Sequence, residues 1–289
     1  GSAFKPFIYA TALDLGYSPL DIINDEPYCL DIPGSGEWCP KNYTKRFLGP
    51  VTMTKALQDS LNIPAVKISE SVGRDLVRRV ASDFGIQSDL AAGPALALGA
   101  SESTLLEMTG AYAGILNGGS SVTPFGLVEL SLLGEDEPLM GTGGGIEERV
   151  IQESSARQLI WMMEKVVSQG SGKRAQFEGR EIAGKTGTTQ GARDAWFIGF
   201  TGDYVAGVWM GYDDNTKLKG VTGGGLPADI WRETMQRVHA GVPVKPLPMQ
   251  APGALQQVTR EPDVAPTAER SQRSVIENLL FDLLGGRGS

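Results

Sequence analysis

The sequence predicts an α+β fold: an antiparallel sheet flanked by helices, with an all-helical lobe beside it. Apolar side chains recur at helical spacing through much of residues 4–117. Residues 181–212 instead contain three runs rich in aromatic and β-branched side chains, and another helical segment follows them. Helices that are segregated from an antiparallel sheet in this way are typical of α+β proteins.

The helical half of the chain is expected to begin with a helix over residues 4–15. Residues 17–50 show no sustained period, so we expect a long loop there. Thr52 or Thr54 can cap a second helix that runs to about residue 61. Pro64 suits the first turn of a third helix, which should continue to about residue 84.

Capping signals mark two more helices before the sheet. Thr104-x-x-Glu107 is typical of a capping box that opens a helix over residues 105–117, and Ser154 can cap a helix that ends at Gly170. Between these helices, residues 122–150 are glycine-rich and irregular, with one short strand expected near residues 127–133.

The three expected strands cover residues 181–189, 195–200 and 204–212. Pro227 then opens a last helix that should end near His239, and we expect this histidine to lie at the surface.

Residues 1–242 are therefore expected to form one domain. Residues 243–289 form a tail in which prolines alternate with polar residues, a composition typical of a linker. Within this tail, only the apolar cluster at 275–284 could form a short amphipathic helix.

Composition argues against several classes of protein. One histidine among 289 residues cannot supply a metal site that needs several imidazoles. Two cysteines cannot hold an iron–sulfur cluster or a four-thiolate zinc site. The formal net charge of −8 argues against binding to duplex nucleic acid, which needs a basic face. We therefore expect no metal, no cofactor and no nucleic-acid partner.

The chain also lacks an obvious targeting segment. No run approaches the ~20 consecutive apolar residues of a membrane span. The first residues are too few and too mixed for a signal peptide, and the chain does not begin with Met. We expect a piece of a longer protein, whose anchor or export signal would lie upstream.

Cys29 and Cys39 flank a stretch rich in proline and glycine. This arrangement fits a local disulfide, which would require an oxidising compartment and contribute roughly 2–3 kcal/mol. Two unrelated reduced thiols are the alternative, and the spacing alone does not decide between them.

With histidine effectively absent, a nucleophile would need another base, and lysine is the usual substitute. Ser2 and Lys5 stand three residues apart, which places them on one face of a helix with Cβ atoms roughly 5–6 Å apart. The free backbone N–H groups at a helix N-terminus also favour a developing oxyanion. Alone, this pattern is weak evidence, because a surface serine and a solvated lysine are the ordinary alternative.

A second candidate is the segment Ser60-Leu61-Asn62, at the end of an expected helix. Its hydroxyl could relay a proton and its amide could hold a peptide group, although both could simply cap a helix. A third candidate is the expected strand Gly184–Thr189, where Thr186 and Thr188 share a face and Lys185 takes the other. Glycine in such a strand often marks close approach of a ligand, and an edge strand can pair with an extended peptide.

Residues 179–186 also match the phosphate-binding pattern G-x-x-x-x-G-K-[ST]. A nucleotide-binding loop must follow a strand and open a helix. Here no apolar strand precedes Gly179, and the residues after Thr186 are poor helix formers. The nucleotide interpretation is therefore disfavoured.

The combination of the three candidates is more specific than any one of them. Ser-x-x-Lys, Ser-x-Asn and Lys-Thr-Gly each occur once and in this order, and together they resemble the motifs of penicillin-binding proteins and serine β-lactamases. The flanking segments, over about residues 1–241, look like the transpeptidase domain of bifunctional, class A penicillin-binding proteins. The segments that carry this likeness cover residues 1–7, 40–43, 170–175, 193–199 and 208–213.

The resemblance implies a role for each motif residue. Ser2 would attack the carbonyl between the two terminal D-alanines of a peptidoglycan stem peptide, with Lys5 as its general base. Ser60 would help to return the proton to the departing D-alanine, and Asn62 would hold the substrate amide. Lys185 would supply positive potential near Ser60.

The same resemblance assigns the substrate-binding residues to the strand. Thr186, Gly187 and Thr188 would bind the substrate carboxylate, or the equivalent group of a β-lactam antibiotic. The oxyanion hole would consist of the backbone N–H groups of Ser2 and Thr188. A stem-peptide amine would then accept the acyl group, and the product would be a cross-link.

The chain also departs from the family pattern. Family domains have strands before the nucleophile, and class A members also carry a glycosyltransferase domain and a membrane anchor. We expect the N-terminal strands to be missing here, leaving a domain that is less stable than the intact one and could be inactive as it stands. The parent protein would be anchored at the outer face of the bacterial inner membrane, in the periplasm.

Two alternatives to a D,D-transpeptidase stay open. A D,D-carboxypeptidase or β-lactamase would use water in place of the acceptor amine, although no deacylating carboxylate is identifiable. A non-catalytic domain that senses β-lactams or serves as a scaffold would be acylated without turnover.

Overall fold

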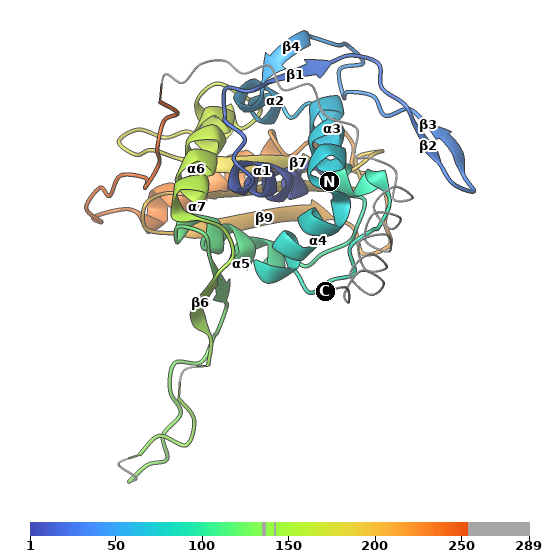
Figure 1. Ribbon diagram of the computed structural model, residues 1–289. Coiled ribbons are helices and arrows are strands. Elements are labelled where there is room, and N and C mark those ends of the chain that lie inside the picture. Colours follow the sequence, from blue (N-terminus) through green and yellow to red (C-terminus); the bar gives the residue numbers. More distant parts are fainter. Residues whose placement is uncertain (135–136, 142, 254–289) are drawn as a thin grey trace, which may run out of the picture.

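The computed structural model describes residues 1–134, 137–141 and 143–253, and it confirms the α+β expectation (Figure 1). Its main sheet is antiparallel, with strand order β7-β8-β9. The strands are β7 (Ala183–Thr188), β8 (Asp194–Phe200) and β9 (Val205–Gly211). Strands β7 and β9 lie within the ranges expected from the sequence, and β8 begins one residue before its expected range.

The two faces of this sheet are covered by different helices. Successive side chains of a strand point to opposite faces. Ile198 and Phe200 of β8 therefore join the larger core, whereas Phe197 packs against Trp231 of the last helix. That helix is α7 (Leu226–Val238). The helices on the larger-core side include α1 (Lys5–Asp14), α5 (Leu105–Leu116) and α6 (Glu153–Ser168).

Helix α1 lies at the centre of the molecule. A short 3-10 turn, η1 (Ser2–Phe4), leads into it, so the helix expected over residues 4–15 is confirmed. Every residue from Lys5 to Leu13 is buried. A helix that is apolar on all sides belongs in a core, and the ring of Phe7 here contacts the rings of Phe84 and Tyr112.

The next three helices are α2 (Met53–Gln58), α3 (Asn62–Val72) and α4 (Arg74–Asp83). The cap expected for α2 is confirmed, since the Thr52 hydroxyl accepts a hydrogen bond from the Lys55 N–H at 3.1 Å. The single long helix expected after Pro64 is wrong. Gly73, with φ of 89°, divides it into α3 and α4.

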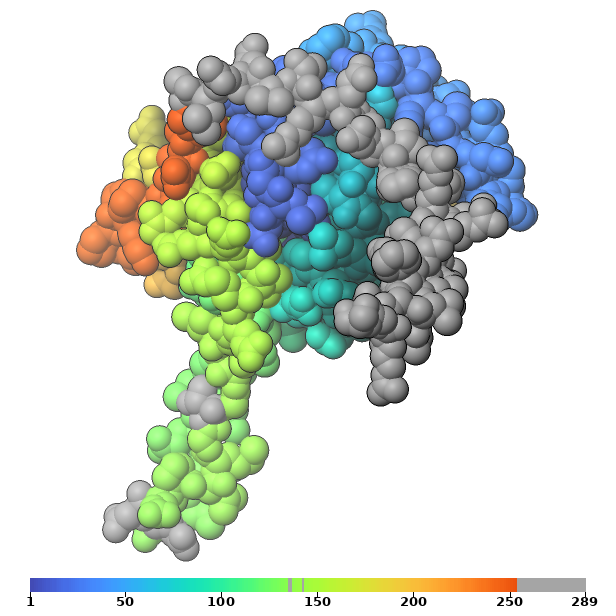
Figure 2. All heavy atoms as spheres, in the orientation of Figure 1, coloured from blue at the N-terminus to red at the C-terminus, as the bar shows by residue number. Residues whose placement is uncertain are grey.

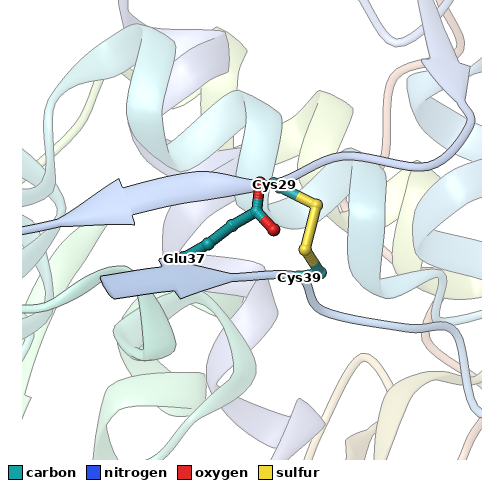
Figure 3. A group of neighbouring side chains, drawn as sticks. All are labelled: Cys29, Glu37 and Cys39. Carbon is teal, nitrogen blue, oxygen red and sulfur yellow. A yellow bond between two sulfur atoms is a disulfide. The ribbon is translucent and has the colours of Figure 1, made fainter. Parts of the chain in front are cut away.

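The stretch of residues 17–50 is not the long loop that the sequence predicts. It contains two antiparallel hairpins, in which β1 (Ile22–Asp25) pairs with β4 (Gly49–Thr52) and β2 (Leu30–Ile32) pairs with β3 (Gly36–Trp38). These strands have three or four residues each, too few for a period to emerge from the sequence. A disulfide joins Cys29 to Cys39 across the base of the second hairpin (Figure 3).

The glycine-rich stretch after α5 projects from the body as an arm (Figures 1 and 2). Its base is a hairpin of β5 (Ser120–Thr123) and β6 (Gly145–Arg149). The strand expected near residues 127–133 is absent from the described residues of the arm, where only the isolated bridge between Leu130 and Met140 occurs. The capping box of α5 is confirmed, whereas α6 begins after Gln152 rather than at a Ser154 cap.

His239 is buried, which contradicts the expectation of a surface residue. Its Nδ1 lies 2.7 Å from the carbonyl oxygen of Met235, and its Nε2 lies 2.8 Å from the Thr201 hydroxyl. The rings of Phe177 and Tyr204 contact the imidazole. The place of His239 at a helix end suggested exposure. Residues distant in the sequence, on the strand side of α7, bury it instead.

Part of the expected tail lies against the domain. Leu247 is buried, and its N–H donates to the Glu181 carboxylate at 2.8 Å. The Gln250 N–H donates to the carbonyl oxygen of Arg157 at 3.0 Å. Residues 247–250 are thus attached to the domain, and the amphipathic segment expected at 275–284 lies outside the described residues. Among the described helices, none has the length and apolarity to cross a membrane.

The disulfide gives a stability prediction. Replacing both cysteines, as Cys29→Ala/Cys39→Ala, should lower the free energy of unfolding by about 2–3 kcal/mol, because the unfolded chain regains the entropy of an open loop. Urea denaturation followed by circular dichroism measures this change. Adding a reductant should destabilise the unmodified chain and leave the double variant unaffected; equal midpoints for both chains would contradict the prediction.

Candidate functional site

Three segments that are far apart in the sequence meet at one hydroxyl group, that of Ser60. Ser60 lies in the turn between α2 and α3. The Nζ atom of Lys185, on β7, lies 2.8 Å from its Oγ. The Nζ atom of Lys5, from the start of α1, lies 3.5 Å from the same Oγ. The structure therefore brings together one residue from each of the three sequence motifs.

The Lys5 side chain is fully buried and is directed toward the Ser60 turn. Its Nζ donates hydrogen bonds to the carbonyl oxygens of Ser60 and Leu61, at 2.8 and 3.1 Å, and to Asn62 Oδ1 at 2.7 Å. Three oxygen acceptors satisfy the three N–H groups of an ammonium. Burial opposes them: it lowers the pKa of Lys5 well below its ordinary value, and the positive charge of Lys185 lowers it further.

Lys185 is the second buried lysine of the site. Besides Ser60, its Nζ donates to the carbonyl oxygen of Thr186 at 3.0 Å. Burial lowers the pKa of Lys185 to about 7. At neutral pH, this amine can therefore exist in both protonation states, which suits a group that passes a proton or holds a carboxylate.

The Ser60 turn has a backbone conformation that its sequence does not favour. Ser60 adopts φ of 58°, in the left-handed region, at a cost of roughly 1–2 kcal/mol for a residue with a Cβ atom. The hydrogen bonds from Lys5 to two successive carbonyl groups, those of Ser60 and Leu61, offset this strain. The lysine thus holds the turn as well as facing its hydroxyl.

Ser2 is placed as the sequence predicts, at the entrance to α1. It is the first residue of the 3-10 turn, three positions before Lys5, and it is partly exposed. Within the described chain, no hydrogen-bond partner is found for its side chain, so Ser2 and Lys5 are neighbours in the helix without being bonded to each other. The Lys5 amine instead uses its donors on the Ser60 turn.

Strand β7 runs past the start of α1, and glycine makes this close approach possible. A Cβ atom at Gly187 would lie 3.1 Å from the Cβ of Ala3 and 3.2 Å from its backbone nitrogen. Thr186 Oγ1 lies 2.8 Å from Ser171 Oγ, and Thr188 Oγ1 accepts a hydrogen bond from the Gly223 N–H at 3.0 Å. Both strand hydroxyls are therefore held by residues that follow or precede the sheet.

Two polar residues of this region are not predicted as site residues from the sequence. One is Ser171, which lies in a segment that carries the family likeness but has no motif of its own. The other is Asn42, whose Oδ1 accepts the backbone N–H of Asn62 at 2.8 Å. Asn42 also lies in a segment that carries the family likeness, residues 40–43, but the sequence there does not indicate a contact with a helix twenty positions later.

A cavity of about 630 Å³ lies beside the start of α1. The residues that line it include Ala3, Phe4, Trp196 and Trp209. The Trp209 indole N–H donates to the Asp194 carboxylate at 3.0 Å. Both tryptophans are partly exposed and line this cavity. Its volume is in the range of small-ligand sites.

Other chemistries receive no support from the described residues. The described group that brings three potential metal ligands together is Cys29, Glu37 and Cys39, where the disulfide consumes both thiols (Figure 3). The nucleotide-binding interpretation is wrong, because Lys185 and Thr186 lie inside β7, which continues to β8 and not to a helix.

Comparison with known proteins identifies the family. A model of the penicillin binding protein transpeptidase domain matches residues 1–236. The chain belongs to this family. The likeness inferred from the motifs is therefore confirmed.

The relatives and neighbours agree with this assignment. Penicillin-binding protein 1A of Rickettsia prowazekii (strain Madrid E) is 33% identical over 282 residues, covering 89% of this chain and 36% of the relative. Penicillin-binding protein 1A of Aquifex aeolicus (strain VF5) is 36% identical over 240 residues, covering 82% and 33%. The chain thus spans about a third of the length of these relatives.

Solved structures share the fold. The crystal structure of penicillin-binding protein 1A from Haemophilus influenzae has a TM-score of 0.77 and 28% identity, and the match covers 93% of this chain and 46% of that one. The PonA1 protein of Mycobacterium tuberculosis in complex with penicillin V has a TM-score of 0.76 and 25% identity, with 91% and 75% covered.

The coupling of the two lysines can be tested directly. Lys185→Met keeps the apolar stem but removes a positive charge, so it should raise the pKa of Lys5, because the Lys5 ammonium no longer faces a like charge. Carbon-13 NMR of the Lys5 Cε as a function of pH measures this shift. Lys55→Met, an exposed lysine on α2, serves as the control and should leave the titration unchanged. A lower or unchanged pKa in Lys185→Met would contradict the coupling.

Proposed function

We propose that this chain is a peptidoglycan D,D-transpeptidase domain that works through a serine acyl-enzyme. Membership of the transpeptidase family supports an acyl-transfer activity. The observation that carries the proposal is the pair of buried lysines, Lys5 and Lys185, on either side of the Ser60 hydroxyl. Because their pKa values are lowered, these two amines can accept and donate protons at neutral pH. They thus take the acid–base role that a histidine has in other serine enzymes.

In the first half-reaction, the Ser2 hydroxyl attacks the carbonyl carbon of the peptide bond between two terminal D-alanines. The neutral amine of Lys5 takes the hydroxyl proton as the new C–O bond forms. The backbone N–H groups of Ser2 and Thr188 stabilise the oxyanion. The C–N bond then breaks, and the departing D-alanine amine receives a proton through Ser60, which both lysines contact.

Substrate binding follows from the groups around this turn. Lys185 and the hydroxyl groups of Thr186 and Thr188 attract the terminal carboxylate, and β7 offers its backbone to the extended peptide. Gly187 lets this strand lie close to the start of α1, because a Cβ atom at this position would lie 3.1 Å from the Cβ atom of Ala3. Asn62 holds the amide of the penultimate residue.

In the second half-reaction, an amine of a neighbouring stem peptide attacks the acyl-enzyme carbonyl. A C–N bond forms, the ester C–O bond breaks, and Ser2 regains its proton. A β-lactam would follow the first half-reaction only, because its opened ring remains attached and blocks the acceptor. The partners are therefore stem peptides and β-lactam antibiotics.

We place the parent protein in the bacterial envelope, on the periplasmic side of the inner membrane, with a glycosyltransferase domain and an anchor elsewhere in its chain. The names of the relatives support such an assignment. The Cys29–Cys39 disulfide also supports it, because such bonds persist in oxidising compartments.

Labelling with a fluorescent penicillin tests the proposal. The unmodified chain should be acylated, and Ser2→Ala should lose the label, because the variant lacks the hydroxyl that is proposed to attack the β-lactam carbonyl. Ser35→Ala, an exposed serine of the β2–β3 turn, is the matched control and should label normally. Labelling of Ser2→Ala at the normal rate would exclude Ser2 as the nucleophile.

The fate of the label separates the related activities. A stable label together with cross-linking of donor and acceptor stem peptides is the expected outcome for a transpeptidase. Rapid release of the label would indicate a β-lactamase, and release of D-alanine without cross-links would indicate a D,D-carboxypeptidase. Within the described residues, no carboxylate is hydrogen-bonded to Lys5, Ser60 or Lys185, so a deacylating base is not identified. A stable label without either product would indicate a sensor.

A further inference from the structure

We infer that Asn42 and Asp25 form a positioning pair that fixes the Ser60–Asn62 turn and thereby directs Asn62 toward Lys5. Neither residue belongs to a catalytic motif, and neither is exposed enough to touch a substrate, since Asn42 is 3% exposed and Asp25 is 0% exposed. The catalytic consequence of the pair rests on the proposed function, whereas the contacts that define it do not.

First, Asn42 caps the N-terminus of helix α3. Its N-cap residue, Leu61, has no side chain that could accept the free N–H groups of the first turn. Asn42 supplies the missing acceptor from another segment. Its Oδ1 accepts the N–H of Asn62 at 2.8 Å and the N–H of Ile63 at 3.3 Å. The position of the helix start therefore depends on a residue outside the helix.

The second step is the orientation of the Asn42 amide. Its Nδ2 donates to both carboxylate oxygens of Asp25, at 2.8 and 2.9 Å, and to the carbonyl oxygen of Arg46 at 2.9 Å. A carboxylate accepts hydrogen bonds and cannot donate them. Asp25 thus keeps the NH₂ group of the Asn42 side chain facing the Asp25 carboxylate. The carbonyl oxygen of the Asn42 side chain therefore faces α3. The Leu48 N–H, at 2.9 Å, holds the carboxylate in turn.

The third step is the Asn62 side chain itself. Its Nδ2 donates to the carbonyl oxygen of Lys41 at 2.7 Å, which leaves Oδ1 to accept from Lys5 Nζ, also at 2.7 Å. The segment Lys41–Asn42 therefore holds Asn62 at two points, its backbone N–H and its side-chain amide. Just before this segment, Cys39 is anchored by the disulfide.

These contacts form one continuous path from strand β1 to the candidate base. Asp25 orients Asn42, Asn42 fixes the start of α3, and Asn62 then contacts Lys5. The strained conformation of Ser60 lies between α2 and this anchored residue. Loosening the anchor should let the turn relax and displace both Ser60 Oγ and Asn62 Oδ1 from the lysines.

A single substitution with a designed rescue tests the pair. Asn42→Asp keeps an oxygen that can accept from α3, but it sets two carboxylates against each other and should lower the rate constant of penicillin acylation roughly 10- to 100-fold. Adding Asp25→Asn restores a donor between the two side chains, so the double variant should recover most of the lost rate. A residue that only filled space would not be rescued by exchanging the amide and the carboxylate.

Glu107→Ala is the matched control. Glu107 also ties a loop to a helix N-terminus, through hydrogen bonds to the Thr104 N–H and the Ser88 hydroxyl. Its loss should lower thermal stability to a similar extent and leave the acylation rate constant unchanged. Folded Asn42→Asp that is acylated at the normal rate would overturn the inference, as would a double variant that is no faster than the single one.

Hydrogen exchange separates this inference from the proposed function. In Asn42→Ala, the backbone N–H groups of Asn62 and Ile63 should exchange at least about tenfold faster than in the unmodified chain, while those of α5 should not. This result does not need an active enzyme. If the unmodified chain is not acylated at all, the proposed function fails, and faster exchange at these two positions still supports the pair. Unchanged exchange there would overturn it.

Discussion

The burial of two lysine amines around one serine hydroxyl is the constraint on which the rest of the structure depends. Removing ammonium groups from water is costly unless oxygen acceptors replace the lost hydration. Lys5 obtains three such acceptors from the Ser60 turn, and Lys185 obtains the Ser60 hydroxyl and a strand carbonyl. Because burial lowers the pKa of Lys185 to about 7, an unfolded chain binds its proton more readily between pH 7 and 10.5. This contribution to stability therefore rises with pH across that window.

The fold supplies what this constraint requires. Helix α1 is buried on all sides and so carries Lys5 into the centre of the molecule. Strand β7 delivers Lys185 from the opposite side, and Gly187 lets the strand approach the start of α1. The turn between α2 and α3 then closes the site, with Ser60 in a left-handed conformation that its neighbours hold in place. Two covered sheet faces, one against α7, keep this strand fixed.

The sequence predicts the parts of this arrangement that depend on local patterns. Helical periodicity, the Thr104–Glu107 capping box and three long strands are visible because each extends over enough residues to give a signal. The hairpins of residues 22–52 are not visible, since strands of three or four residues have no period. The three motifs predict which residues meet, but not that Lys5 would face the Ser60 turn rather than Ser2. That choice, like the burial of His239 and the contacts of Asn42, is made by partners that are distant in the sequence.

The arm after α5 determines how the protein should be handled in solution. Several of its large apolar side chains are more than two-fifths exposed, among them Phe125, Leu127, Val128, Leu130, Leu132, Leu133, Leu139, Met140 and Ile146. The same stretch, residues 120–149, contains six acidic residues and one arginine. Mutual repulsion between these carboxylates keeps such arms apart at neutral pH. Near the isoelectric point of about 4.9, that repulsion fades while the apolar area remains. Colloidal stability therefore depends on the acidic side chains of this stretch.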